Sequence, residues 1–283
     1  MVIERAPLED ELGDVLEKAM RLTGGDESAL AAQAGLEVAR IRDALDYRHD
    51  FSGEEASRLA AALGLNEVGL AALAGGCYPL PEIAGLPFCL YPLRMPHGVG
   101  VVNAYLVADC AQSRGLLFDA GADFTQLRRV WPKNLRRLDA VFITHAETEH
   151  AGGLAEVQAA FGPAPVYAPV GARLTDVDVI ALGEGECVQF GDIEVRAIST
   201  PGHAAAHNCY GVTVPRVPSA SPLLVSGDLL FAGSVGGGYF SASLLRAGLR
   251  RLFTELPDHT VVAPGHGPLT TIKHERAFNP FTV

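Results

Sequence analysis

Residues of the types that bind metals stand at the ends of short apolar runs at four places in this chain. The run "LDAVFIT" leads into "HAETEH" at residues 145–150, and "IEVRAIS" leads into a Pro-Gly turn and His203. Asp228 follows the run "LLVSG", and His266 follows "VVAPG". A rigid strand holds the residues just beyond its end in place while leaving them out of the core. The four places therefore predict a site assembled on a layered sheet domain.

Further β-like runs fill this part of the chain, with helical stretches between some of them. The runs are "FCLYPL", "GVVNAYLV", "GLLFDAG", "LDAVFITH", "APVYAP", "CVQF", "IEVRAIS", "NCYGVTV", "PLLVSG" and "TVVAPG". Helices are expected near residues 124–130, 154–161 and 244–256. Strands mixed with helices predict an α/β domain over residues 86–283.

The first 76 residues have a different character, with helical spacing and few β-like runs. "LEDELGDVLEKAMRL" repeats apolar residues at helical intervals, and Ser52 with Glu55 forms the pattern of a capping box. The Pro-rich "CYPLPEIAG", residues 77–85, is typical of a linker. We therefore predict a small helical domain over residues 1–76, a linker, and the α/β domain.

The order of the short helices, with a tight "AGL" joint between the second and third, resembles a Cro/repressor-like helix-turn-helix domain over residues 8–74. The resemblance implies a recognition helix from Val38 to Leu45. Residues 1–76, however, hold 15 Asp and Glu against 7 Lys and Arg, a net charge of −8 that would repel a duplex. We disfavour DNA as a partner, and expect these helices to form a homodimer or to cover the other domain.

The composition of the whole chain supports a globular protein of two domains. It has 283 residues, 48% of them hydrophobic, and a formal net charge of −11, which opposes general affinity for nucleic acid. Neither an apolar leader nor a run long enough for a membrane span is visible, so we expect a cytoplasmic protein without a membrane partner. The cysteines form no C-x-x-C pair and are expected to be buried thiols in a reducing compartment: Cys77, Cys89, Cys110, Cys187 and Cys209.

The two histidines of "HAETEH" lie five residues apart, which excludes the shared helix face of an H-E-x-x-H site. With the other motifs, the chain resembles the metallo-β-lactamase superfamily and its glyoxalase II-like hydrolases over residues 86–283. The motifs are "NAYLV", "LLFDAG", the T-H-x-x-x-x-H loop, "TPGH", "SGDLLFAGSVG" and "PGHGP". The resemblance implies an αββα sandwich with two metal ions at one edge.

The same resemblance implies a role for each of the site residues. The first metal would be held by His145, Glu147 and His203, and the second by Glu149, His150 and His266. Asp228 would bridge the two metals and, with Glu149, act in catalysis. Asp119 in "DAG" is expected to support the metal loop from beneath.

Two positions depart from the usual H-x-H-x-D-H loop. Glu147 stands in place of a histidine, similar to the H-x-E-x-D pattern of flavodiiron proteins, and Glu149 stands in place of an aspartate. A carboxylate adds a hard, negative ligand, which favours iron or manganese over zinc and makes the metal pair less electrophilic. A site that binds one metal or none is the alternative.

His207 is interpreted as a satisfied loop histidine or a support near the site, and Tyr239 as a packed aromatic beside a glycine-rich pocket lining at residues 233–241. His97, His259 and His274 lack a ligand-like context.

The leading hypothesis is a hydrolase in which a metal-bridging hydroxide attacks a thioester, lactone or similar small-molecule ester. The first alternative is a non-haem di-iron protein that binds or reduces O₂ or NO, as Glu147 suggests. The second is a metal-responsive transcriptional regulator. Little chain follows His266, so the glutathione specificity of glyoxalase II is not carried over.

Overall fold

The computed structural model of the chain describes residues 6–48, 51–98, 100–109 and 113–282. Its first part is helical and contains α1 (Leu12–Thr23), α2 (Glu27–Ala34), α3 (Val38–Leu45), α4 (Gly53–Leu63) and α5 (Glu67–Ala74). The predicted capping box is confirmed at the start of α4, where Ser52 and Glu55 each accept the other's backbone N–H. The buried faces of the five helices share one apolar core, which includes Leu16, Ile41 and Leu59.

Two mixed sheets follow, each built from six strands. The first runs in the order β1 (Cys89–His97), β2 (Gly100–Ala108), β3 (Arg114–Phe118), β4 (Arg137–Phe142), β5 (Val166–Pro169) and β6 (Ile180–Leu182). The second runs in the order β14 (Thr270–Thr271), β13 (Val261–Pro264), β10 (Leu223–Gly227), β9 (Asn208–Thr213), β8 (Ile193–Ser199) and β7 (Cys187–Phe190). A small ribbon, β11 (Leu230–Phe231) with β12 (Ser234–Val235), follows β10.

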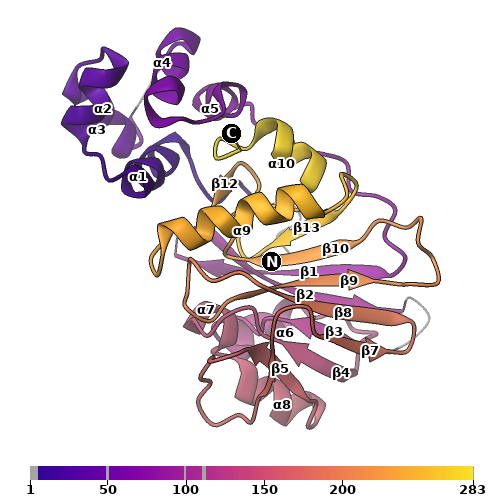
Figure 1. Cartoon of the computed structure of the whole chain (residues 1–283). Coiled ribbons are helices and arrows are strands. Elements are labelled where there is room, and N and C mark those ends of the chain that lie inside the picture. Colours follow the sequence, from indigo (N-terminus) through magenta and orange to yellow (C-terminus); the bar gives the residue numbers. More distant parts are fainter. Residues whose placement is uncertain (1–5, 49–50, 99, 110–112, 283) are drawn as a thin grey trace.

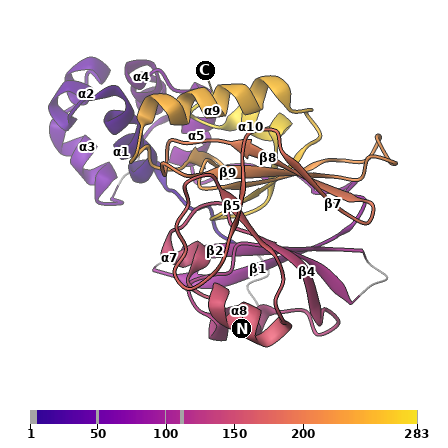
Figure 2. The ribbon, with the colours of Figure 1, turned by 60° about the horizontal axis from the view of Figure 1, so that its bottom comes forward.

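The two sheets pack face to face between two layers of helices, which confirms the αββα sandwich (Figures 1 and 2). Phe118, Phe142 and Tyr210 fill the space between the sheets, and the first two rings stack at 5.0 Å. The outer face of the first sheet is covered by α6 (Phe124–Val130) and α8 (Leu154–Phe161). The outer face of the second is covered by α9 (Ala242–Glu255) and α10 (Ile272–Phe278).

The helical region is docked on the sandwich beside α9 and α10 (Figure 1). The backbone N–H of Asn66, the N-cap of α5, donates to Pro280 O at 2.7 Å, and its side chain donates to Ala277 O at 3.1 Å. Gly69 of α5 lies so close to Phe278 that a Cβ atom there would overlap the Phe278 carbonyl oxygen. The contact between α5 and α10 is therefore as close as the packing inside a domain.

The structure bears on two expectations drawn from composition, membrane-spanning helices and the state of the cysteines. Within the residues that the structure describes, no helix is long and apolar enough to cross a membrane. The expectation of buried free thiols was wrong for most of the cysteines. Cys77 lies exposed in the connection after α5, Cys187 is exposed because β7 is an edge strand, and Cys89 is disulfide-bonded. Only Cys209 is a buried free thiol among the described cysteines, and Cys110 lies outside the described residues.

Candidate metal centre

The loop after β4 is held from beneath by Asp119, which follows β3. Asp119 has a φ of 60°, a left-handed conformation that aspartate tolerates better than most residues. Its Oδ1 accepts the backbone N–H of Thr144 at 2.8 Å, and its Oδ2 accepts the Thr144 hydroxyl at 2.9 Å. The same Oδ2 lies 3.1 Å from Nδ1 of His150. Asp119 therefore orients both the start of the loop and one histidine, as predicted for a supporting residue.

A single helical turn, α7 (Thr148–Ala151), carries Glu149 and His150. Two glycines after it permit close packing, because a Cβ on Gly152 would overlap the Ala122 carbonyl oxygen and one on Gly153 would lie 2.7 Å from that of Ala120. The turn is thereby pressed against the loop that follows β3, and His150 is fully buried.

The second sheet contributes His203 after β8, Asp228 after β10 and His266 after β13. Nδ1 of His203 lies 3.1 Å from Gly237 O, and Nδ1 of His266 lies 3.1 Å from Val101 O. A backbone carbonyl accepts only from an N–H, so each ring carries a proton on Nδ1 and turns Nε2 inward. This is the ring orientation in which a histidine binds a metal through Nε2.

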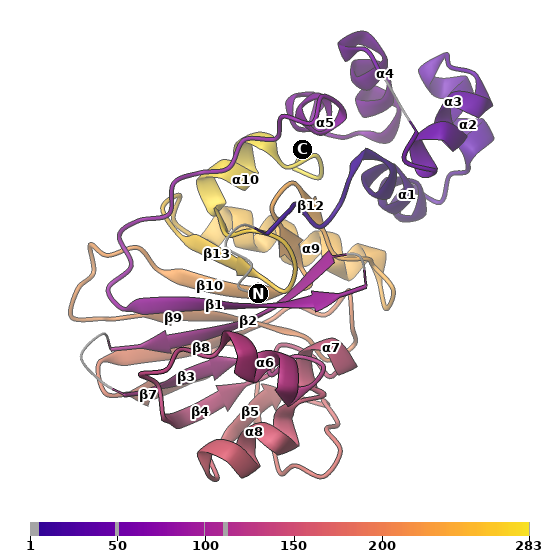
Figure 3. The same ribbon diagram turned by 180° about the vertical axis from the view of Figure 1, so that it is seen from behind.

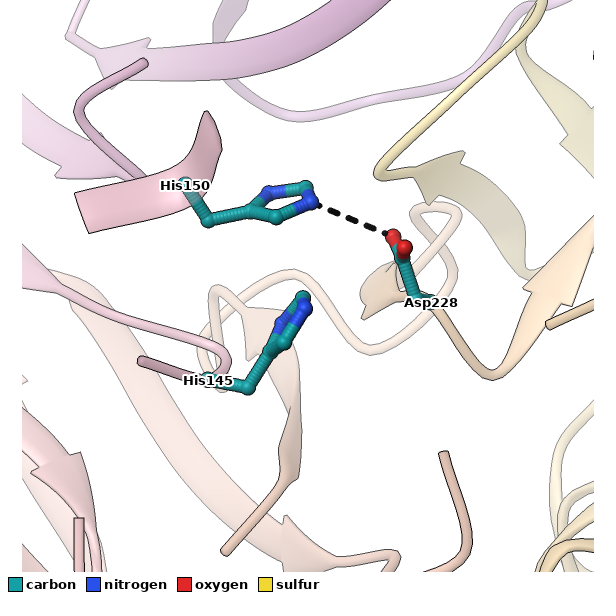
Figure 4. A group of neighbouring side chains, drawn as sticks. All are labelled: His145, His150 and Asp228. Carbon is teal, nitrogen blue, oxygen red and sulfur yellow. Dashed lines mark ion pairs between the residues drawn. The ribbon is translucent and has the colours of Figure 1, made fainter. Parts of the chain in front are cut away.

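These side chains converge into three groups whose ligand atoms lie within 4.8 Å of one another. The groups are His145 with His150 and Asp228, His145 with Glu147 and His203, and Glu149 with His150 and His266. Figure 4 shows His145 and His150 side by side, with Asp228 facing His150. All seven residues that the resemblance implies as ligands thus lie together at one edge of the sandwich.

Asp228 lies between the groups. Its Oδ1 is 3.4 Å from Nε2 of His150, and its Oδ2 is 3.7 Å from Nε2 of His203 and 3.3 Å from Nε2 of His266. One carboxylate therefore faces histidines from both of the ligand groups that the sequence suggested. Its two oxygens could therefore contact a cation held by either group.

Buried atoms without hydrogen-bond partners mark the same place. Among the described residues they include Nε2 of His145, His150 and His203, and Oδ1 of Asp228. The carboxylate contacts of His150 and His203, at 3.4 and 3.1 Å, come from within the same groups and lack hydrogen-bond geometry. Buried polar atoms are rarely left unpaired, and each one costs about 1–3 kcal/mol unless something binds it. Four such atoms that face one another fit a metal site, since a cation would satisfy them together.

The charges in the pocket attract a cation. Burial alone would raise the pKa of Asp228, but His150 and His266 hold it well below its usual value. Burial would lower the pKa of His150, yet the carboxylates of Asp228 and Asp119 raise it well above its usual value. For His145 burial dominates and lowers the pKa well below its usual value, which leaves a neutral imidazole. A metal ion can therefore take the place of the proton that these carboxylates favour on His150.

The two glutamates sit differently in the pocket. Glu147 Oε1 lies 3.1 Å from Nε2 of His203, and its Oε2 lies 3.9 Å from Nε2 of His145. Glu149 is less exposed than Glu147 and lies 3.9 Å from Nε2 of His97. Each carboxylate nevertheless has an oxygen within 4.8 Å of the other ligand atoms of its group, despite the departures from the usual loop.

Two side chains that were considered from the sequence, His207 and Tyr239, border the site. His207 is buried, with Nδ1 2.8 Å from Thr200 Oγ1, and its Nε2 accepts the Asp228 backbone N–H at 3.2 Å. Burial lowers the pKa of His207 to about 3, so it stays a neutral support. Tyr239 is exposed rather than packed, with its ring 5.4 Å from that of His203.

Sequence reasoning missed two neighbours of the site. His97 ends β1, and the hairpin into β2 places its ring 6.3 Å from that of His266. Glu9 belongs to the segment before α1 and lies 3.6 Å from Nδ1 of His266. Neither residue stands next to a motif, so nothing in its sequence context indicated this placement. His259 is exposed, and His274 packs against Tyr78 and Phe278 away from the site.

Comparison with known proteins identifies the family. The model of the metallo-beta-lactamase superfamily matches residues 97–266. A probable metallo-hydrolase of Bacillus subtilis is 32% identical over 213 residues, which cover 66% of this chain and 95% of that protein. A hydroxyacylglutathione hydrolase of Pseudomonas entomophila is 31% identical over 178 residues, which cover 62% of this chain and 66% of that protein.

Among solved structures, a protein crystallised in a di-iron-bound form is 30% identical, with a TM-score of 0.52. The similarity covers 66% of this chain and 98% of that chain. The family match includes the residues of the metal centre from His145 to His266, whereas the helical region lies outside it. The chain belongs to the metallo-beta-lactamase superfamily.

Proposed function

We propose that this protein is a hydrolase with a binuclear metal centre that cleaves a thioester, a lactone or a similar ester. The observation that carries the proposal is the position of Asp228, whose two oxygens face histidines of both metal groups. The hydrolase names of the Bacillus and Pseudomonas relatives support the reaction class. Two divalent ions supply, when bound, a water of lowered pKa and a Lewis acid for the carbonyl oxygen.

The side chains have separate tasks in this proposal. His145, Glu147 and His203 hold the first metal, and Glu149, His150 and His266 hold the second. Asp228 faces histidines of both groups and offers a buried carboxylate that can orient the attacking water. The rim formed by His97 and Tyr239 is partly exposed, and a substrate can approach there.

The metal preference follows from the donor set. Glu147 supplies oxygen where the family's usual loop has imidazole nitrogen, and hard oxygen donors favour iron or manganese. The di-iron form of the similar solved structure supports iron. We therefore propose iron or manganese ahead of zinc.

The carboxylate of Glu147 in the first metal group also favours a second candidate, a di-iron protein that binds or reduces O₂ or NO. Purification without added metal, followed by elemental analysis, an absorption spectrum and assays on thioesters and lactones, separates the two. Turnover of an ester that stops on chelation supports the hydrolase. Oxo-bridge absorption with no ester turnover favours the di-iron oxidoreductase.

A matched pair of variants links the assay to the site. His266→Ala removes a ligand and should abolish turnover, because a metal group loses one of its members. His259→Ala removes an exposed histidine from the loop before β13 and should leave turnover unchanged. Equal rates in both variants would place the reaction elsewhere.

For the helical region we propose a role within the chain rather than DNA binding. The arginines in or beside α3 are paired with carboxylates: Arg40 with Glu55, Arg42 with Glu27, and Arg48 with Asp43 and Asp46. Paired guanidinium groups are less available to phosphates, which supports the proposal. A gel-retardation experiment at moderate salt tests it, and a shifted duplex would contradict it.

A further inference from the structure

The segment that precedes α1 runs along the edge of the metal centre. The Glu9 carboxylate lies 3.6 Å from Nδ1 of His266. A Cβ atom on Gly267 would lie 3.2 Å from the Glu9 backbone nitrogen, and one on Gly100 would lie 3.3 Å from the Glu9 carboxylate. The segment is therefore seated closely against the loop that carries His266. Figure 3 shows this indigo segment passing beside β12 on its way to α1.

Asp10 and Lys18 connect the helical region to β12. The Asp10 carboxylate accepts a hydrogen bond from Ser234 Oγ and forms an ion pair with Lys18. Lys18 Nζ also donates to Val235 O at 2.9 Å. The side chains of Asp10 and Lys18 are only 7% and 17% exposed, so water screens the pair little. The two residues therefore fix β12 against α1 and the segment before it.

The chain after β12 orients His203. Gly236 lies against Asp228, because a Cβ atom there would overlap the Asp228 carbonyl oxygen. The next residue, Gly237, places its carbonyl oxygen 3.1 Å from Nδ1 of His203. This contact holds the ring so that Nε2 faces Glu147 at 3.1 Å. The geometry of the first metal group thus depends on where the loop after β12 lies.

A continuous set of contacts therefore joins the helical region to a metal ligand. It runs from Asp10 and Lys18 through β12 to Gly237 and then to His203. Partners that orient a metal-binding histidine commonly change metal affinity about 10- to 100-fold when they are lost. The family match begins at residue 97, so Asp10 and Lys18 lie outside it.

We propose that Asp10 and Lys18 are positioning residues, through which the helical region sets the metal affinity of the group that contains His203. The proposal rests on the binuclear centre of the proposed function. It also gives the acidic helical region a task that needs no nucleic acid, namely to complete the support of the metal centre.

If the Asp10–Lys18 ion pair only stabilised the fold, its loss would affect metal binding differently. Loss of stability alone would loosen both metal groups to the same extent. The second group has its own supports, since His150 is oriented by Asp119 and His266 by Val101 O. Glu9 and Asp228 also reach the second group, so positioning through the loop after β12 should loosen the first group more than the second.

The test uses the full chain with Asp10→Asn and Lys18→Met combined, so that neither buried charge is left unpaired. Zinc-loaded protein is mixed with a chromogenic chelator, and zinc release is followed in time. We expect the variant to release one ion about 10- to 100-fold faster than the wild type, and the other with a clearly smaller acceleration. Equal acceleration of both ions, or of neither, would overturn the proposal.

Two further variants sharpen this experiment. Glu27→Gln combined with Arg42→Met removes an ion pair of the helical region that lies far from β12 (Figure 1), with side chains 37% and 65% exposed. This control variant should release both ions at the wild-type rate.

Ser234→Ala removes only the hydroxyl that contacts Asp10 and keeps both charges, so it remains informative if the double variant fails to fold. It should accelerate the same ion to a smaller extent, and unchanged release would count against the proposal.

The outcomes for the proposed function are separate. A wild-type protein that binds two ions but hydrolyses no ester contradicts the hydrolase, while selective release in the variant still supports the positioning role. A wild-type protein that hydrolyses esters, with identical release in wild type and variants, leaves the hydrolase standing and removes the positioning role. Wild-type protein that binds no metal overturns both.

Discussion

Oδ2 of Asp119 lies 3.1 Å from Nδ1 of His150, and the Asp119 backbone has a φ of 60°. One residue thus supplies both a left-handed turn after β3 and the partner that orients a buried histidine. Asp119→Asn keeps the turn, because asparagine tolerates this conformation, but it replaces a charged acceptor. We expect Asp119→Asn to fold normally and to bind the second metal about 10- to 100-fold more weakly.

Asp119→Ala tests the two tasks together. Alanine in the left-handed region costs about 1–2 kcal/mol, and the lost hydrogen bonds to Thr144 add to this cost. The alanine variant should therefore lose both stability and metal affinity, whereas the asparagine variant should lose mainly affinity. Denaturant unfolding and metal titration of the two variants measure the difference, and identical behaviour of both would refute the division of tasks.

Gly236, in the loop after β12, gives a second prediction, with Gly248 of α9 as its control. Gly236→Ala forces the loop away from the Asp228 carbonyl oxygen and so disturbs the carbonyl of Gly237 that holds His203. We expect metal affinity of the first group to fall about 10- to 100-fold. Gly248 of α9 is the control, because its added Cβ meets only Leu229 and Thr200 side chains at ordinary distances of 3.6 and 3.7 Å.

Gly248→Ala should instead stabilise the fold by about 1 kcal/mol, since alanine is the better helix former. Metal titration and thermal unfolding of both variants suffice for the comparison. Unaltered metal affinity in Gly236→Ala would show that the loop adapts without moving His203.

The strand ends that carry the ligands could be predicted because each follows an apolar run, and three of the four runs are closed by Pro-Gly or Ser-Gly. The elements that sequence reasoning missed are short. β6, β11, β12 and β14 have two or three residues and α7 has four, so no periodicity can develop in them. The seven-residue helix α10 was missed as well. The existence of these elements depends on neighbours, as for β12, whose position is set by Asp10 and Lys18.

Contacts across the chain explain the rest of what was missed. Lys18 and Val235 are separated by 217 positions, and Glu9 and His266 meet only because the helical region docks beside the second sheet. No local pattern distinguishes Lys18 from other lysines on an amphipathic helix. The ligand types are local information, whereas the supports of the ligands are consequences of tertiary packing.

A buried glutamate gives a prediction about pH. Glu275 of α10 accepts hydrogen bonds from Thr270, Tyr78, Asn279 and the Gly233 backbone, and burial raises its pKa above the usual 4.5. Because the folded state holds this proton more tightly than the unfolded state, the stabilisation is complete below pH 4.5 and is lost as pH rises through the folded pKa.

Glu275→Gln removes the titration while keeping most of the shape. The variant should be less stable than the wild type at low pH, and the gap should narrow as the pH rises, by at most about 1.4 kcal/mol per pH unit. Unfolding free energies from pH 4 to pH 8 measure this. A gap that is constant, or that widens with pH, would show that Glu275 is ionised throughout.

The substitution Glu147→His tests whether the unusual carboxylate sets the choice of metal. The carboxylate lies 3.1 Å from Nε2 of His203 and 3.9 Å from Nε2 of His145, so an imidazole at this position would face the same group. Exchanging a hard, charged oxygen for a neutral nitrogen should shift the metal content of protein grown in mixed-metal medium from iron or manganese towards zinc. It should also raise ester turnover with zinc, since the metals lose a negative ligand and become more electrophilic. Elemental analysis and ester turnover of wild type and variant decide the matter, and an unchanged metal ratio would mean that the other six ligands dictate the metal.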